Sequence, residues 1–252
     1  MFSDPFFIAA AVTAVLISGI AKGGFGGGIS VMSVPILSLV VPPPQAAAIM
    51  LPLLVFMDLF GIWAYRGKWD KANLKILLPA SLCGVIIGTA TFRYLDVWAF
   101  RLIIGTIAVS FALNSWFNWS QRERPPATRS WRRGGFWGMV AGFVSFVAHA
   151  GGPPVSVYLL PQRLDKTMFQ ATTVVFFTTT NLIKLVPYTL LGQFNTENLT
   201  TSLTLAPLVP LAMLSAIYLH TRVSDRLFYK VCFILLFLTG CKLLYDGFSA
   251  VI

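Results

Sequence analysis

Long runs of apolar residues, almost free of charge, divide this chain, and they restrict the folds that it can adopt. The polar breaks between the runs are short, and none is long enough to form a soluble domain. A membrane-spanning helix needs about 20 predominantly apolar residues, and most of the runs are near that length. The runs cover residues 6–41, 45–65, 74–92, 98–119, 135–161, 167–191, 203–219 and 228–251.

The composition excludes an ordinary soluble protein. Charged residues make up 11% of the 252 positions, whereas a soluble domain has about 25%. The net charge is +10, and in a membrane protein such an excess belongs to cytoplasmic loops. We therefore expect an all-α polytopic protein with the lipid bilayer as its surroundings and no nucleic acid as a partner.

Two of the runs are interrupted near their middle by glycine, and each is followed by three further runs. This layout indicates a faint internal repeat. We divide the chain into a first repeat over 1–119, a basic linker over 120–134 and a second repeat over 135–252. The residues at the breaks are Lys22, Gly23, Gly24, Gly26, Gly27 and Gly28 in the first repeat and His149, Gly151 and Gly152 in the second.

The positive charges of corresponding loops predict that the two repeats are inverted. Loop 66–75 is rich in lysine and arginine, whereas its counterpart 192–202 has neither. Loop 220–230 carries three basic residues, and the linker 120–134 carries five. Because basic loops face the cytoplasm, corresponding loops lie on opposite sides, as in the inverted repeats of many transporters. Both termini are then expected on the periplasmic side.

Each broken run must contribute either no net crossing or two crossings for the repeats to be inverted. In the first case it is a hairpin that enters the bilayer and returns, and in the second it is a pair of full spans. The returning arms, about 28–41 and 152–161, are short for a full span, which favours the hairpin. The paired spans remain the alternative.

The glycine breaks are candidate anion sites. A helix that starts after such a break presents unpaired backbone N–H groups and the positive end of its dipole, and both attract anions. The alternative is close helix packing, because Gly19, Gly23 and Gly27 are four residues apart, a spacing that lets helices approach. The two interpretations are compatible.

Five polar residues inside apolar runs complete the candidate site, because intramembrane ionisable groups are costly and commonly functional. Lys22 and His149 stand beside the two breaks, and both are candidate substrate ligands together with Asn181. Asp58, the counterpart of Asn181 in the first repeat, is a candidate for coupling or for an ion pair, as is Lys184. The chain has no metal-binding spacing of cysteine and histidine, and we expect no metal and no cofactor.

The segments LISGIAKGGFGGGISVMSVPIL and GFVSFVAHAGGPPVSVYLL resemble the TauE/SafE sulfite exporter family. The resemblance covers essentially the whole chain, although the second segment has fewer glycines than the family pattern. It implies a multi-pass carrier in the bacterial inner membrane for sulfite, sulfonates or related organosulfur anions. Only the glycines of the two breaks fall on the family motif.

These features predict a secondary transporter that moves a small sulfur-containing anion by alternating access, with export as the expected direction. An anion channel is the main alternative. An intramembrane enzyme using Asp58 and His149 as acid and base is a weaker alternative, because the sequence has no HExxH or GxSxG pattern. A scaffold subunit of a membrane complex is a further one.

Overall fold

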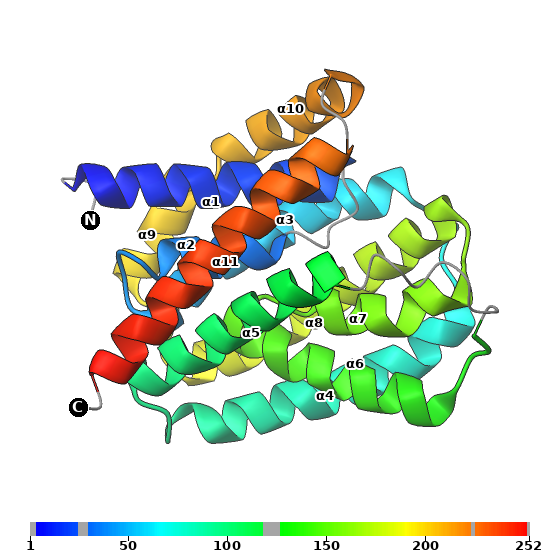
Figure 1. Ribbon diagram of the computed structural model, residues 1–252, viewed down its shortest axis with the longest axis horizontal. Coiled ribbons are helices and arrows are strands. Elements are labelled where there is room, and N and C mark those ends of the chain that lie inside the picture. The colour runs from blue at the N-terminus through cyan, green and yellow to red at the C-terminus, as the bar shows by residue number, and fades with distance from the viewer. Residues whose placement is uncertain (1–3, 25–29, 118–126, 223–224, 251–252) are drawn as a thin grey trace.

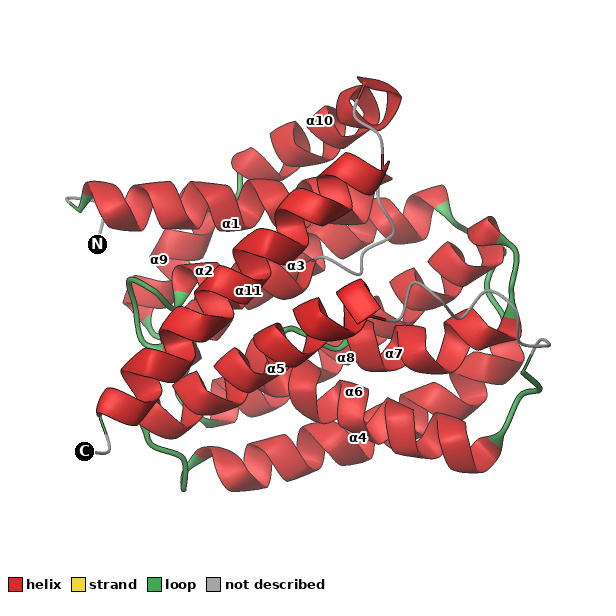
Figure 2. Cartoon of the chain, in the orientation of Figure 1, coloured by secondary structure: helices red, strands yellow, loops and turns green. Residues whose placement is uncertain are grey.

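The computed structural model describes residues 4–24, 30–117, 127–222 and 225–250. All regular elements among them are helices, as expected, and no strand occurs in these ranges. Figure 1 and Figure 2 show them as a bundle of long helices joined by short turns.

The first half contains five α-helices and one short 3₁₀ helix. They are α1 (Pro5–Gly24), η1 (Ser30–Met32), α2 (Ser33–Leu37), α3 (Pro43–Ala64), α4 (Lys71–Phe92) and α5 (Val97–Phe117). The second half contains α6 (Trp131–Ala148), α7 (Gly152–Leu159), η3 (Leu160–Gln162), α8 (Lys166–Leu190), α9 (Thr196–Leu205), α10 (Leu208–Arg222) and α11 (Asp225–Ser249).

Five of the helices within the described ranges are long and apolar enough to cross a membrane, namely α1, α3, α4, α5 and α11. A sixth span results if α9 and α10 count as one, since they are bent by 44° relative to each other. The bend falls at Pro207, which lacks a backbone N–H group and interrupts helical hydrogen bonding. The run 203–219, expected as one span, is therefore part of a broken helix pair that begins at Thr196.

Helix α8 forms where the run 167–191 predicts a helix. Among the described residues, however, α8 is not one of the helices that are apolar enough to cross a membrane. Its central turns carry threonine, asparagine and lysine rather than leucine. Threonine hydroxyls in it donate to carbonyls of the preceding turn, for example Thr178 to Val174 and Thr180 to Phe176, both at 2.8 Å. Because these groups are satisfied within the helix, α8 can lie in the interior of the bundle.

Helix α3 lies at the centre of the hydrophobic core. Six consecutive residues, 46–51, are buried in its first half, so that every face of this stretch is covered. A helix covered all round must lie inside the bundle rather than at its lipid surface. Helix α3 contacts α8 and also α1 and α9, so polar side chains on α3 and α8 meet in the interior.

The second broken run folds back on itself. Helix α6 extends from Ser130, whose side chain caps it, to His149, and α7 then returns along α6. A side chain at Gly134, in the first turn of α6, would collide with Tyr158 near the end of α7. The amide of Ala127, before α6, donates to the carbonyl of Pro161, after α7, at 2.8 Å. Both ends of the run thus lie together, although its insertion into a bilayer as a hairpin stays a prediction.

The basic turns lie at one end of the bundle and both termini at the other (Figure 1). The turn after α3, the segment before α6 and the turn before α8 are at the right of the view, and N and C are at the left. By the distribution of positive charge the right end is the cytoplasmic one, and this orientation stays a prediction.

The long first helix of each half, α1 or α6, packs against a helix of the other half. Helix α1 packs on α10 through Gly19 and Gly23, and α6 packs on α4 through Gly138 and Gly142. In both pairs the helices run parallel, whereas the pairs α3–α8 and α5–α11 run antiparallel. A two-fold axis in the membrane plane produces this reciprocal pattern, and the pattern supports the inverted repeat, which itself stays a proposal.

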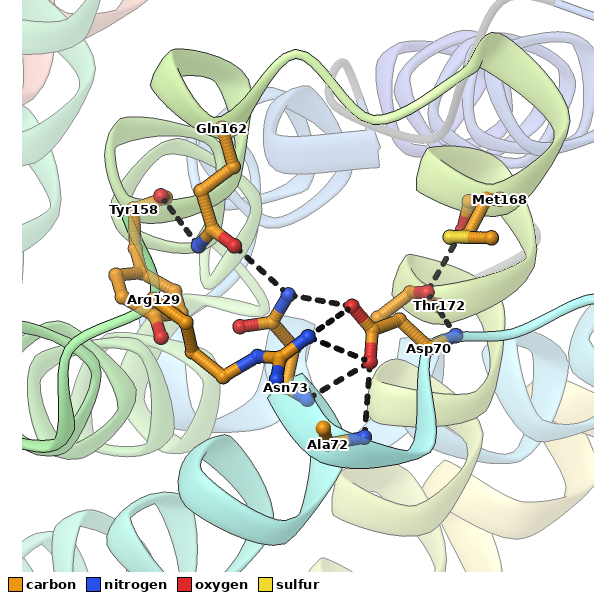
Figure 3. A network of polar contacts seen from close by, with 8 residues as sticks. All are labelled: Asp70, Ala72, Asn73, Arg129, Tyr158, Gln162, Met168 and Thr172. Carbon is orange, nitrogen blue, oxygen red and sulfur yellow. Dashed lines mark hydrogen bonds and ion pairs between the residues drawn. The ribbon is translucent and has the colours of Figure 1, made fainter. Parts of the chain in front are cut away.

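A polar network ties the halves together at the basic end (Figure 3). The Asp70 carboxylate caps α4 by accepting hydrogen bonds from the amides of Ala72 and Asn73, and it pairs with Arg129 at 3.1 Å. The Asn73 side chain also donates to Gln162, at 2.9 Å, and the Asp70 amide donates to Thr172 on α8, also at 2.9 Å. The network therefore joins α4 to the end of the returning arm and to α8.

Gly142 allows α6 to approach α4 closely, and its substitution by alanine should destabilise the protein. An added Cβ atom would lie 2.1 Å from the Ser81 carbonyl oxygen, which is backbone and cannot swing away. We expect a loss of about 1–3 kcal/mol or more, measured by thermal unfolding of the purified protein in detergent. Gly135→Ala is the matched control, because nothing lies within 4 Å of its Cβ. Equal effects of the two substitutions would contradict this packing.

The Asp70 network should make stability depend on pH. Burial acts to raise the pKa of Asp70, but hydrogen bonds from the Asn73 and Ala72 amides and the Arg129 charge outweigh it and lower the pKa below its usual value. A lowered pKa stabilises the fold above the unfolded value of about 3.9, and this contribution disappears as the pH falls through the folded value.

The stability difference between the wild type and Asp70→Asn should therefore be full at neutral pH and shrink below about pH 4. Thermal midpoints measured across this range test it. Asp165→Asn, which removes the charge of the corresponding N-cap residue of α8 and keeps a capping oxygen, serves as the control. A difference for Asp70→Asn that stays constant with pH would argue against a stabilising charge on Asp70.

Candidate functional site

Two of the expected residues, Lys22 and Asn181, contact the carboxylate of a third, Asp58, and each of the three belongs to a different helix. Lys22, in the last turn of α1, pairs with one Asp58 oxygen, and Asn181 of α8 donates to the other at 2.6 Å. The Asp58 side chain is 3% exposed and that of Lys22 is 11% exposed. A buried carboxylate needs both a countercharge and hydrogen bonds, and Asp58 has both.

A second polar group lies one turn further along α8. Lys184 is fully buried, and its ammonium group donates to the Ser145 carbonyl at 2.9 Å and to the Ser145 hydroxyl at 3.0 Å. Its third contact is Nδ1 of His149 at 2.6 Å. An ammonium group uses all three of its hydrogens in these contacts, and the three partners, a carbonyl, a hydroxyl and an imidazole nitrogen, carry no negative charge.

His149 terminates α6 and connects the second group to α3. Its backbone adopts the left-handed conformation with φ of 51°, a strained geometry for a residue other than glycine. Its Nε2 lies 2.8 Å from the Ala47 carbonyl oxygen of α3. Because a carbonyl only accepts, Nε2 carries a hydrogen. Nδ1 lies 2.6 Å from Lys184 Nζ and 3.2 Å from the Ser145 carbonyl oxygen, and it accepts from Lys184 when the imidazole is neutral.

Together these residues form one charged cluster. Lys22, Asp58, His149 and Lys184 are close enough to interact electrostatically. With both lysines and Asp58 ionised, the cluster carries a net charge of +1. Charge of this kind is costly in a membrane interior, and a negatively charged ligand would compensate it.

A small cavity reaches the cluster beside Lys22 and Asp58. Its volume is about 20 Å³, and its lining includes Gly61 of α3 and Gln170, Thr173 and Phe177 of α8. This volume holds about one water molecule, so the site is closed to anything larger in this conformation. The cavity lies on the side of Asp58 that faces the basic end of the bundle.

Sequence reasoning missed Gln170 and Thr173, although a periodic pattern points to them. Residues 170, 173, 177, 181 and 184 follow one another at intervals of three or four, which places them on one face of a helix. The face bears four polar residues and could have been found by that spacing.

The glycines of the breaks occupy different environments. Gly23 and Gly24 belong to the last turn of α1, and a Cβ on Gly23 would collide with Ala216 of α10. Gly26, Gly27 and Gly28 lie outside the described residues. Gly23 is therefore a packing residue, as the alternative interpretation of the glycine spacing holds.

The second break offers fewer amides than a helix start normally does. Gly151 precedes α7, and a Cβ on it would lie 2.8 Å from the Ala141 carbonyl oxygen. Gly152 is the first residue of α7, and Pro153 and Pro154 follow it. Because proline has no N–H group, the first turn of α7 can present the amides of the two glycines but not those of the next two residues.

The arrangement offers charge and hydrogen bonds rather than a metal centre. Within the described ranges, no group of three or more histidine, cysteine, aspartate or glutamate side chains is placed to hold a metal ion. Lys22 and Asn181 converge on the position of a carboxylate, the type of ligand arrangement that an oxyanion also requires.

Comparison with known proteins identifies the family. The family model described as Sulfite exporter TauE/SafE matches residues 11–243 of the chain. No curated protein and no solved structure matches it. The match spans both polar groups of the cluster and all the helices around them, and the chain therefore belongs to the TauE/SafE sulfite exporter family.

Proposed function

We propose that the chain is a secondary transporter that moves sulfite, a sulfonate or a related sulfur-containing anion across the bacterial inner membrane by alternating access. The chain is a multi-pass protein of a transporter family, and the family name gives export as the direction. The observation that carries the proposal is the interior cluster of two lysines and one aspartate next to a cavity.

Lys22 is the proposed primary ligand of the anion. It is the more exposed of the two clustered lysines and lines the cavity. Asn181, next to it, has an amide that can donate to an oxyanion as it donates to Asp58. The glycine segment that follows Lys22, with Gly26, Gly27 and Gly28, and the amides of Gly151 and Gly152 are proposed to complete the shell. His149 would orient the second glycine break.

The cavity is too small for a sulfonate, so transport requires the helices around it to separate. The cavity lies between Asp58 and the basic end, and the Asp70 network closes that end by joining α4, α8 and the returning arm. The packing of the first helix of each half against the other half supports a rocking motion, because one half can turn against the other without breaking a helix.

Loss of the Lys22 charge should weaken anion binding. Lys22→Gln alone would leave the buried Asp58 unpaired, at a cost of about 3–5 kcal/mol. The sharper variant is the double substitution Lys22→Gln/Asp58→Asn, which removes both charges and keeps hydrogen-bonding groups. We expect it to fold and to bind sulfite or methanesulfonate at least about tenfold more weakly, a difference of about 1.4 kcal/mol.

The matched control is Lys242→Gln/Asp246→Asn, which removes an exposed ion pair of α11. Binding is measured by calorimetry or by ligand-induced thermal shift on the purified proteins. Wild-type affinity in the Lys22/Asp58 double variant would exclude Lys22 from the site.

Counterflow separates a carrier from the alternative, an anion channel. Proteoliposomes preloaded with unlabelled methanesulfonate should transiently accumulate labelled methanesulfonate above its equilibrium level, because a carrier exchanges one substrate for another across the membrane. A channel lets both species equilibrate without such an overshoot, so that its absence together with rapid flux would establish the channel instead.

A further inference from the structure

Lys184 differs from Lys22 in having no carboxylate among its hydrogen-bond partners in the described structure. Its three contacts are the Ser145 carbonyl, the Ser145 hydroxyl and His149. No part of its side chain is exposed to solvent. An ammonium group in such a place is held only by neutral acceptors, so its proton is retained at a high free-energy cost.

The 2.6 Å contact between Lys184 Nζ and His149 Nδ1 requires one hydrogen between the two nitrogens. Since His149 Nε2 already donates to Ala47, this hydrogen is on Nζ in the neutral pair, and both a neutral amine and an ammonium group carry one. The pair therefore keeps the contact with or without an extra proton on Nζ. The two residues therefore take up and release protons as a unit.

The charges around this pair come from two other helices. Lys22 on α1 and Asp58 on α3 both interact electrostatically with Lys184. Among the described residues, a further titratable group packed against the pair is Tyr188 of α8, whose ring stacks on His149 and whose hydroxyl donates to the Phe146 carbonyl. Lys22 and Asp58 compensate each other, so the proton on the pair is the uncompensated charge of the cluster.

An anion that binds beside Lys22 changes this balance. Without the extra proton, the cluster with a bound monoanion carries a net charge of −1, and with it the net charge is zero. The bound anion therefore favours the proton, and the proton favours the anion to the same extent, because such coupling is reciprocal.

We infer that the Lys184–His149 pair takes up one proton from water when a monoanion binds beside Lys22 and returns it to water when the anion leaves. One proton then crosses the membrane with each monoanion, and the cycle is electroneutral. Export of this type is driven by the cytoplasmic excess of the anion, is opposed by an acidic exterior, and does not depend on the membrane potential. The inference rests on the proposed function and adds the coupling ion to it.

The test uses methanesulfonate, which remains a monoanion across the working pH range, so that any pH dependence belongs to the protein. In weakly buffered solution, binding to the purified wild type should take up about one proton per anion. Affinity should fall about tenfold per pH unit once the free protein has lost the proton. In proteoliposomes at zero membrane potential, an acidic exterior should drive accumulation of methanesulfonate.

Lys184→Arg retains a permanent charge at the position and should bind methanesulfonate with little pH dependence and without accumulation in response to the proton gradient. Lys184→Met removes the charge and should bind the anion at least tenfold more weakly. Lys242→Arg on the exposed surface of α11 is the control and should behave as the wild type does.

The wild-type measurements decide the matter even if the Lys184 variants do not fold. Binding and transport of methanesulfonate without proton uptake, and without a response to the proton gradient, would overturn the coupling and leave the proposed function intact. Proton coupling that persists in Lys184→Arg would assign it to another residue. No binding of any sulfur-containing anion would remove the proposed function and the coupling with it.

Discussion

Compensation of charge inside an apolar helical bundle is the constraint on which the rest of the structure depends. Two lysines and one aspartate lie in the interior, where each isolated charge would be far more costly than in water. Asp58 is therefore placed between Lys22 and Asn181, and Lys184 is surrounded by acceptors from the end of α6. These contacts draw α1, α3, α6 and α8 to a common point, which is where the cavity ends.

Close packing by glycine makes this convergence possible. The pairs α1–α10 and α4–α6 approach so closely that a methyl group does not fit at Gly23 or Gly142. Such contacts replace the hydrophobic effect, which does not drive helix association within lipid. They also pack the first helix of each half against a helix of the other half, and the proposed rocking motion would turn the halves about these contacts.

The helices could be predicted from the apolar runs, because a bilayer permits few alternatives to a helix of the right length. The polar residues Lys22, Asp58, Asn181 and Lys184 could be singled out for the same reason. Their pairing could not, since it depends on which faces of α1, α3 and α8 meet. The break at Pro207 and the polar face with Gln170 and Thr173 had local signals in proline and in helical spacing.

The role of the glycines was harder to predict, because the spacing that suits a tight turn also suits helix packing. Gly23 packs against α10, and two prolines reduce the amides that follow Gly152. In the proposed transporter the side chains of the cluster, rather than backbone amides alone, would therefore be the main source of attraction for an anion. The residues proposed to bind the substrate are also those that compensate the interior charges.

An experimental structure of the chain with bound selenite, an analogue of sulfite with strong anomalous scattering, tests the central claim most directly. The account predicts a selenium peak within hydrogen-bonding range of the Lys22 ammonium group and next to Asn181, in a conformation with an enlarged cavity. A peak at the lipid headgroup boundary, with Lys22, Asp58 and Lys184 unchanged and no anion near them, would contradict it.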